Sequence, residues 1–225
     1  MINANTEQLE ATFDRIASDL LRLALTGLGH RLQRELKEHG PVSPDRLEQL
    51  TNAVDANAED VADLMAYVET DAQGRITGAM GLTVNPTVHE FRVDGRQLYT
   101  WCAFDALVFA VAHGWTAEVR SRCPATGRPI QLTATPDGVT AQDPQETVLA
   151  LAVPDPEKLP SGTQQVQAAY CAHNNLYVSE QAALQAIGDR AGVVITALAD
   201  AHRFAQRLVA AVQPTGDADR IPEQR

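Results

Sequence analysis

Apolar residues recur at helical spacing through the first third of the chain. Leucines return every three or four positions over about residues 7–39, and the Gly27–Gly29 stretch predicts a break within that helical segment. Ser43 followed by Pro44 is typical of a helix N-cap and first turn, and a third helix is expected over Ala58–Val68. The pattern therefore predicts that the first third of the chain consists of short helices.

After about residue 80 the spacing of apolar residues becomes that of β-strands. Phe91 and Val93 alternate with charged residues and lead into Asp94-Gly95, a strong hairpin-turn signal. The later segments predict these elements in order: a short buried helix over 102–113 stopped by Gly114, strands over 116–123, 129–136 and 146–154, an extended buried segment around Cys171, a capped helix over 179–192, a strand over 193–198 and a last helix over 199–212.

Short helices followed by the Gly-rich segment 71–82 are typical of a winged helix, a fold that often binds DNA. Residues 58–71 nevertheless carry acidic side chains and no Lys or Arg, so phosphates would repel them. The formal charge of −11 and the pI near 4.9 also disfavour a polyanionic partner. We therefore expect no nucleic acid among the partners of this protein.

The sequence has no pattern of a secretory signal and no run of about 18 apolar residues. A soluble cytoplasmic protein without a membrane partner is therefore expected. The three cysteines, Cys102, Cys123 and Cys171, form no CxxC pair, which disfavours a disulfide framework or a zinc ribbon. If these thiols take part in chemistry, the fold has to bring them together.

The most apolar stretch, LYTWCAFDALVFAVAH, contains both Cys102 and Asp105. At positions i and i+3 of a first helical turn the two side chains share one face. The positive end of the helix dipole is expected to lower the pKa of the thiol. Burial is expected to raise the pKa of the carboxyl, making it a proton donor and acceptor. The predicted walls of this site are apolar: Trp101, Phe104, Leu107 and Phe109.

Spacing alone favours a plainer interpretation, in which Cys102 is a small buried hydrophobe and Asp105 caps the helix. A third group would change that balance. Cys171, in AAYCAHNN, is the natural partner, because two thiolates with one carboxylate suit a soft, thiophilic metal rather than Mg²⁺ or Ca²⁺. Sequence separation says nothing about whether the three side chains meet.

Three runs make the pattern more specific: GLTVNPTVHEFRVDGRQLYTWCAFDALVFA, TAEVRSRCPATGRPIQLTATP and YCAHNNLYVS. From about Gly81 to His202 the chain resembles the bacterial organomercurial (alkylmercury) lyases. The resemblance implies an α+β fold, with a winged-helix-like helical lobe before a mixed β-sheet flanked by helices. We accordingly expect a lobe over 1–80, a catalytic domain over 81–212 and a flexible tail over 213–225.

Residue by residue, the resemblance assigns the two catalytic cysteines of the family to Cys102 and Cys171, and its catalytic aspartate to Asp105. These groups would also bind the mercury of substrate and product. Cys123 matches a structural cysteine. Some members have a second cysteine directly after the catalytic one, where this chain has Ala172. The set of two cysteines and one aspartate is complete without it.

The resemblance implies protonolysis of the carbon–mercury bond of alkyl- or arylmercury, giving a hydrocarbon and Hg(II). It implies no organic cofactor, with small thiols releasing the product and a mercuric reductase as an acceptor. Two alternatives stay open: a non-catalytic mercury or metal sensor, and a homologue acting on another substrate. Contributions from His173 and Tyr99 are also open, with His173 on the same face as Cys171 if that segment is a strand.

Overall fold

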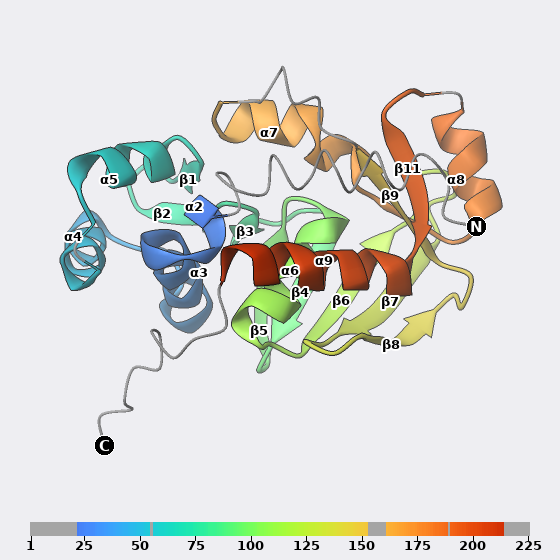
Figure 1. The fold of residues 1–225 in the computed structure, drawn as a ribbon, viewed down its shortest axis with the longest axis horizontal. Helices are drawn as coiled ribbons and strands as arrows, with labels where there is room; N and C mark the ends of the chain where they lie inside the picture. The colour runs from blue at the N-terminus through green and yellow to red at the C-terminus, as the bar shows by residue number, and fades with distance from the viewer. Residues whose placement is uncertain (1–21, 55, 153–160, 189, 214–225) are drawn as a thin grey trace.

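The computed structural model describes residues 22–54, 56–152, 161–188 and 190–213 (Figure 1). The part of the first predicted helix before residue 22, most of the Pro-rich loop after residue 152 and the predicted tail from residue 214 lie outside the described residues. Within the described part of the chain, no helix is both long and apolar enough to cross a membrane.

The N-terminal helices follow the predicted pattern closely. Helices α2 (Arg22–Leu25) and α3 (Gly27–His39) meet at the expected break. Helix α4 (Pro44–Ala53) begins after Ser43, whose hydroxyl accepts a hydrogen bond from the Arg46 N–H at 3.2 Å. Such a cap satisfies one of the backbone donors that every helix start leaves unpaired.

Helix α5 (Ala58–Met65) is shorter than the sequence suggests. Asn57 and Asp60 form a capping box at its start. Its expected last residue, Val68, instead begins strand β1 (Val68–Thr70) and pairs with Ala79. The helical spacing of apolar residues extended past the end of α5 because Val68 packs against the same core, although it does so from a strand.

One eight-stranded sheet extends from these helices across the molecule (Figure 1). Its strand order is β1-β2-β3-β5-β4-β6-β7-β8, and every pairing is antiparallel. The boundary expected after residue 80 falls between two neighbouring strands of this sheet. The strands after β1 are β2 (Ile76–Ala79), β3 (Leu82–Thr83), β4 (His89–Val93), β5 (Arg96–Thr100), β6 (Ala117–Arg122), β7 (Pro129–Ala134) and β8 (Val139–Asp143).

The predicted hairpin at Asp94-Gly95 joins β4 to β5. Both turn residues have positive φ, 50° for Asp94 and 76° for Gly95, as a two-residue hairpin requires. Strands β6 and β7 follow the two predicted strands and pair with each other, whereas β8 was not expected at all. Its sequence, VTAQD, is short and polar, and pairing with β7 decides its conformation.

A second sheet has three strands in the order β10-β9-β11, also antiparallel. These are β9 (Val148–Ala152), β10 (Leu176–Tyr177) and β11 (Val193–Ala197). Helix α8 (Glu180–Ile187), capped by Ser179, lies between β10 and β11 in the chain. The expected α+β class, with helices leading, is confirmed, although the paired strands run antiparallel instead of in mixed directions.

Helix α6 (Ala103–His113) lies at the centre of the molecule. It contacts strands of both sheets on one side and helix α9 (Leu198–Val212) on the other, as Figure 1 shows. The rings of Phe104 and Phe204 stack across the two helices with centroids 5.7 Å apart. Gly114 ends α6 as predicted, with φ of 68°. The helix is buried from Ala103 to Ala110, apart from the partly buried Asp105, as expected for a helix with so few polar residues.

The segment that carries Cys171 contradicts the expected extended structure. Helix α7 (Thr163–Ala169) is followed by Tyr170 and then by a single 3₁₀ turn, η2 (Cys171–His173). The Gln and Ala residues that make up most of α7 favour a helix over an extended segment. Strand structure begins only at Leu176.

Candidate active site

The N-terminus of α6 places Cys102 and Asp105 side by side. Cys102 is the N-cap, and the two residues form a capping box. The Cys102 N–H donates to the Asp105 carboxylate at 2.9 Å, and the Asp105 N–H donates back to the Cys102 side chain. Thr100, the last residue of β5, donates its hydroxyl to the Cys102 carbonyl at 2.7 Å and fixes the turn into the helix.

Cys171 completes a cluster with this pair. The sulfur atoms of Cys102 and Cys171 and a carboxylate oxygen of Asp105 all lie within 4.8 Å of one another. Both thiols are free and buried, and Asp105 is partly buried. The fold therefore brings Cys171 next to Cys102 and Asp105, although it is far from both of them in the sequence.

Backbone contacts bring the turn η2 to α6. The Ala103 N–H, in the first turn of α6, donates to the Asn174 carbonyl at 3.0 Å. Asn174 in turn donates its N–H to the carbonyls of Tyr170 and Cys171, at 3.1 and 3.2 Å. The position of the Cys171 turn is thus tied directly to the helix start that carries Cys102.

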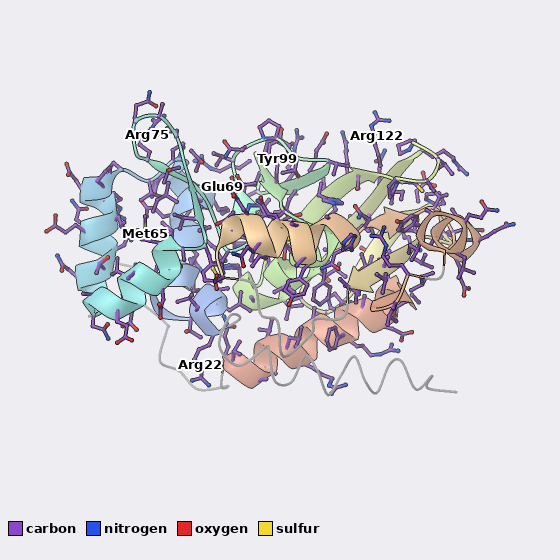
Figure 2. All side chains as sticks on the ribbon, turned by 90° about the horizontal axis from the view of Figure 1, so that it is seen from above. Arg22, Met65, Glu69, Arg75, Tyr99 and Arg122 are labelled. Atoms are coloured by element: carbon purple, nitrogen blue, oxygen red, sulfur yellow. The ribbon has the colours of Figure 1, made fainter. Side chains whose placement is uncertain are left out.

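Helix α7, immediately before Cys171, is attached to the N-terminal part of the molecule. The Thr163 N–H donates to the Ala66 carbonyl at 2.9 Å, and Gln167 donates its amide to the Glu69 carboxylate at 3.1 Å. Figure 2 shows Glu69 beside this helix. The chain therefore enters the Cys171 turn from a fixed direction.

The surroundings of Asp105 raise its pKa well above the ordinary carboxyl value. Desolvation by burial is the main cause, and the neighbouring Cys102 adds to it, while the hydrogen bond from the Cys102 N–H acts in the opposite direction. This matches the direction predicted from the apolar sequence. A carboxyl of this kind takes up and returns a proton more readily near neutral pH.

The pKa of Cys102 moves in the direction opposite to prediction. Burial raises the pKa of this thiol well above its usual value, and the hydrogen bond with Cys171 and the charge of Cys171 raise it further. The hydrogen bonds from the Asp105 N–H and the Asn174 amide favour the thiolate but do not outweigh burial. The helix start was therefore the weaker influence, and burial shifts both Cys102 and Asp105 toward their uncharged forms.

The four expected wall residues are all buried in the core, at 8% exposure or less: Trp101, Phe104, Leu107 and Phe109. The Phe109 ring meets Phe91 edge-on at 6.4 Å, which fixes α6 against the sheet. The Trp101 indole N–H has no hydrogen-bond partner within the described ranges. Trp115 belongs to the core as well and stacks on His113.

Cys123 and His173, which the sequence also brought into consideration, are not members of the cluster within 4.8 Å. Cys123 is buried where the chain leaves β6; burial would raise its pKa, but hydrogen bonds from the Thr126 side chain and from nearby backbone N–H groups lower it overall. His173 is half-buried, with Nδ1 2.8 Å from Nη1 of Arg190, and the strand that would have aligned it with Cys171 is absent. Tyr99 lies on the opposite face of β5 from the buried Leu98.

Two residues at the site were missed by sequence analysis. Gly81, with φ of 108°, packs against the carboxyl of Asp105, and its carbonyl accepts from the Trp101 N–H at 2.8 Å. Asn174 contacts Cys102 from the opposite segment. The run AMGL offered a weak signal for a special backbone position. No local pattern around Asn174 and Asn175 indicated that Asn174 would lie at the site.

Two soft sulfur ligands lie together with one carboxyl of raised pKa, a set of groups that suits a thiophilic metal centre. The family model described as "Alkylmercury lyase" matches residues 82–210, a range that includes all three side chains. The chain belongs to the alkylmercury lyase family.

Individual relatives agree with this assignment. A protein named alkylmercury lyase from Streptomyces lividans is 37% identical to this chain, and the match covers 77% of this chain and 79% of the relative. The alkylmercury lyase of Pseudomonas putida is 36% identical, with 79% of this chain and 82% of the relative covered. The one from Staphylococcus epidermidis is 31% identical, with 96% of this chain and 94% of the relative covered, so this match spans nearly the whole of both chains.

The fold is shared with a solved structure. A crystal structure described as the mercury-bound form of MerB2 superposes with a TM-score of 0.69, covering 92% of this chain and 97% of the other. The two sequences are 20% identical, so this likeness concerns the fold.

Proposed function

We propose that this protein cleaves the carbon–mercury bond of alkyl- or arylmercury compounds by protonolysis, releasing a hydrocarbon and retaining Hg(II). The observation that carries the proposal is the enclosed cluster of Cys102, Cys171 and Asp105, whose ligand atoms lie within 4.8 Å of one another. Membership of the alkylmercury lyase family supports the same substrate class.

The first step is capture of the substrate, R–Hg–X, by sulfur. The Cys102 sulfur attacks mercury and loses its proton, which leaves with X as HX. A thiol bound to a soft metal is deprotonated even where burial otherwise keeps it neutral. The raised pKa of Cys102 therefore keeps this thiol neutral in the empty site without preventing capture.

The second step adds the other thiol and moves a proton. Cys171 binds mercury, and its proton passes to Asp105, whose raised pKa suits this task. Mercury then carries R and two sulfurs, which makes the carbon electron-rich. Asp105 delivers the proton to that carbon, the C–Hg bond breaks, and R–H leaves. Overall, R–Hg–X and two thiols give R–H, HX and a mercuric bis-thiolate.

Release of Hg(II) requires competing sulfur ligands. Small thiols exchange with the two cysteines, and a mercuric reductase is a suitable final acceptor. The reaction calls for no organic cofactor, because the side chains supply both ligands and the proton. The free thiols suit a reducing compartment, and we place the protein in the cytoplasm.

A metal sensor is the weaker proposal. A DNA-binding winged helix needs a basic recognition helix, whereas α5 reads AEDVADLM. Its capping box is acidic as well. The two sulfurs and the carboxyl of the described site favour a soft metal compound as the substrate.

The proposal is tested by incubating the protein with phenylmercury and excess thiol and measuring benzene by gas chromatography. Cys102→Ser and Cys171→Ser should each abolish turnover, and Asp105→Ala should bind phenylmercury without releasing benzene. The same variants tested with methylmercury should fail to release methane. An active Cys171→Ser variant would refute the two-thiol mechanism, and an Asp105→Ala variant with the wild-type rate would refute the proton transfer.

A further inference from the structure

Glu69 is the residue at which three segments around the active site meet. It is the middle residue of β1 and is partly buried. One oxygen of its carboxylate, Oε2, accepts the Thr83 hydroxyl at 2.7 Å and the Asn85 amide at 2.8 Å. The other oxygen, Oε1, accepts the Gln167 amide at 3.1 Å. Strand β3, the loop after it and helix α7, which Figure 2 shows beside Glu69, therefore share one carboxylate.

The fold reserves space for this carboxylate. Gly78, in β2, is the cross-strand partner of Glu69. A Cβ atom on Gly78 would lie 2.7 Å from Oε2 of Glu69 and 2.9 Å from the Cβ of Thr83. Real Cβ atoms essentially never make contacts that short, so glycine is what lets the carboxylate lie against Thr83. The hydrogen bonds of Glu69 accordingly belong to a packed arrangement rather than to a loose surface contact.

The hydrogen bond with Thr83 connects Glu69 to the carboxyl side of the active site. Thr83 is fully buried in β3, shortly after Gly81 in the chain. Gly81 packs directly against the Asp105 carboxyl. Because β3 also pairs with β5, the segment behind Asp105 is held from both sides. A shift of Glu69 is therefore expected to reach Asp105 through a short and rigid path.

The hydrogen bond with Gln167 connects Glu69 to the thiol on the other side of the site. Gln167 lies in α7, shortly before Cys171. The Tyr170 N–H donates to the Val166 carbonyl at 2.9 Å, so the helical path continues to the turn of Cys171. None of the seven residues of α7 is fully buried, and Val166 packs against the core while partly buried. Polar contacts therefore have a large share in placing this helix.

We propose that Glu69 is a positioning residue for the proposed reaction. Through Thr83 it holds the segment behind Asp105, and through Gln167 it holds the helix that leads to Cys171. It thereby keeps the two sides of the cluster at the separation that one mercury atom needs, and small shifts of reacting groups lower a rate strongly. The catalytic consequence rests on the proposed function, whereas the spacing of the two thiols does not.

Gln167→Glu is the sharpest variant, because it replaces a hydrogen bond by two carboxylates that face and repel each other. Helix α7 should then move away from β1 and displace Cys171. The exchange of Glu69→Gln together with Gln167→Glu restores the contact, since the new amide in β1 can donate to the new carboxylate in α7. The oxygen of that amide stays available to Thr83 and Asn85.

Gln164→Glu is the matched control. Gln164 is exposed on the same helix, so the substitution adds the same charge to α7. In the described part of the chain, the hydrogen bonds of the Glu69 carboxylate come from Thr83, Asn85 and Gln167 instead. Urea unfolding of every variant separates a loss of function from a loss of folding.

The first measurement is the affinity for Hg(II), determined in competition with dithiothreitol. Tight binding requires both sulfurs on one metal ion, so it reports their spacing without any cleavage step. We expect Gln167→Glu to weaken Hg(II) binding about tenfold and the exchange variant to return to within about twofold of the wild type. Gln164→Glu should match the wild type. Unchanged affinity in Gln167→Glu, or a loss that the exchange does not restore, would overturn the proposal.

The second measurement is single-turnover release of benzene over a series of phenylmercury concentrations. Cys102 captures the substrate before Cys171 is needed, so Gln167→Glu should lower the maximal rate about tenfold and leave the half-saturating concentration unchanged. The exchange variant should recover the rate. A loss confined to the half-saturating concentration would overturn the proposal. Restored Hg(II) binding with no benzene from any form, wild type included, would uphold the positioning of the thiols and refute the proposed function instead.

Discussion

Gly81 and Asp105 approach so closely that a Cβ atom placed on Gly81 would lie 2.9 Å from the carboxyl carbon of Asp105. Real Cβ atoms essentially never come so near another heavy atom, and the φ of Gly81, 108°, is itself a conformation that favours glycine. A residue without a side chain therefore forms the wall behind the proposed proton donor.

Gly81→Ala is accordingly expected to displace the Asp105 carboxyl and lower the rate of benzene release from phenylmercury about a hundredfold, as small misplacements of reacting groups do. Gly74→Ala is the matched control. Gly74 also has positive φ, 74°, but no heavy atom outside its chain neighbours lies within 4 Å of the point that a Cβ would occupy. It should lose about 1 kcal/mol of stability from backbone strain while keeping its activity. Equal activity in both variants would contradict the packing account.

Asp105→Asn is expected to abolish turnover and to raise stability at neutral pH. The raised pKa of Asp105 means that its uncharged form favours folding. That contribution is complete below the ordinary carboxyl pKa and is lost as the pH rises through the raised value. The asparagine stays uncharged and can still accept the Cys102 N–H. Urea unfolding should show that the stability gained by Asp105→Asn over the wild type is larger at pH 8 than at pH 5. The same gain at both pH values would contradict the prediction.

His89 should contribute to acid sensitivity. Burial lowers the pKa of this imidazole from 6.5 to about 4, and its Nδ1 lies 2.9 Å from the Ser121 hydroxyl. Below about pH 6.5 the imidazole is protonated in the unfolded chain but not in the folded one, so the free energy of unfolding falls as the pH drops. His89→Asn should reduce the loss of unfolding free energy between pH 7 and pH 4 by about 3 kcal/mol. Identical pH slopes for the two proteins would exclude this contribution.

Cys123 separates a structural thiol from the reactive pair. It is 1% exposed, and hydrogen bonds from Thr126 and nearby backbone groups reach its sulfur. Cys123→Ser keeps a hydrogen-bonding group of similar size, so turnover should persist within about twofold while the melting temperature falls by a few degrees. Loss of benzene release in a folded Cys123→Ser protein would show that a third thiol takes part.

Much of the architecture followed from local sequence signals. Ser43, the Asp94-Gly95 turn and Gly114 each act through their own backbone, so their roles are visible in the chain itself. The relation between Cys102 and Asp105 is of the same kind, because a helix turn relates positions i and i+3. The structure adds that the pair caps α6 as well as facing Cys171.

The remaining features depend on tertiary contacts. The turn of Cys171 is set by hydrogen bonds from α6 and from the segment around Tyr170, which no local pattern reports. The pKa of Cys102 depends on how completely the fold buries the thiol and on its distance from Cys171. Asn174 and Gly81 matter only because distant segments meet there.

A single turnover in D₂O tests the central claim most directly. Phenylmercury is supplied in equal amount to the protein, with no added thiol, and the products are analysed by mass spectrometry. The two-thiol, one-carboxyl mechanism predicts one monodeuterated benzene per chain, with Hg(II) retained and both Cys102 and Cys171 protected from alkylation. Phenylmercury recovered intact, or benzene released while Cys171 stays open to alkylation, would contradict it.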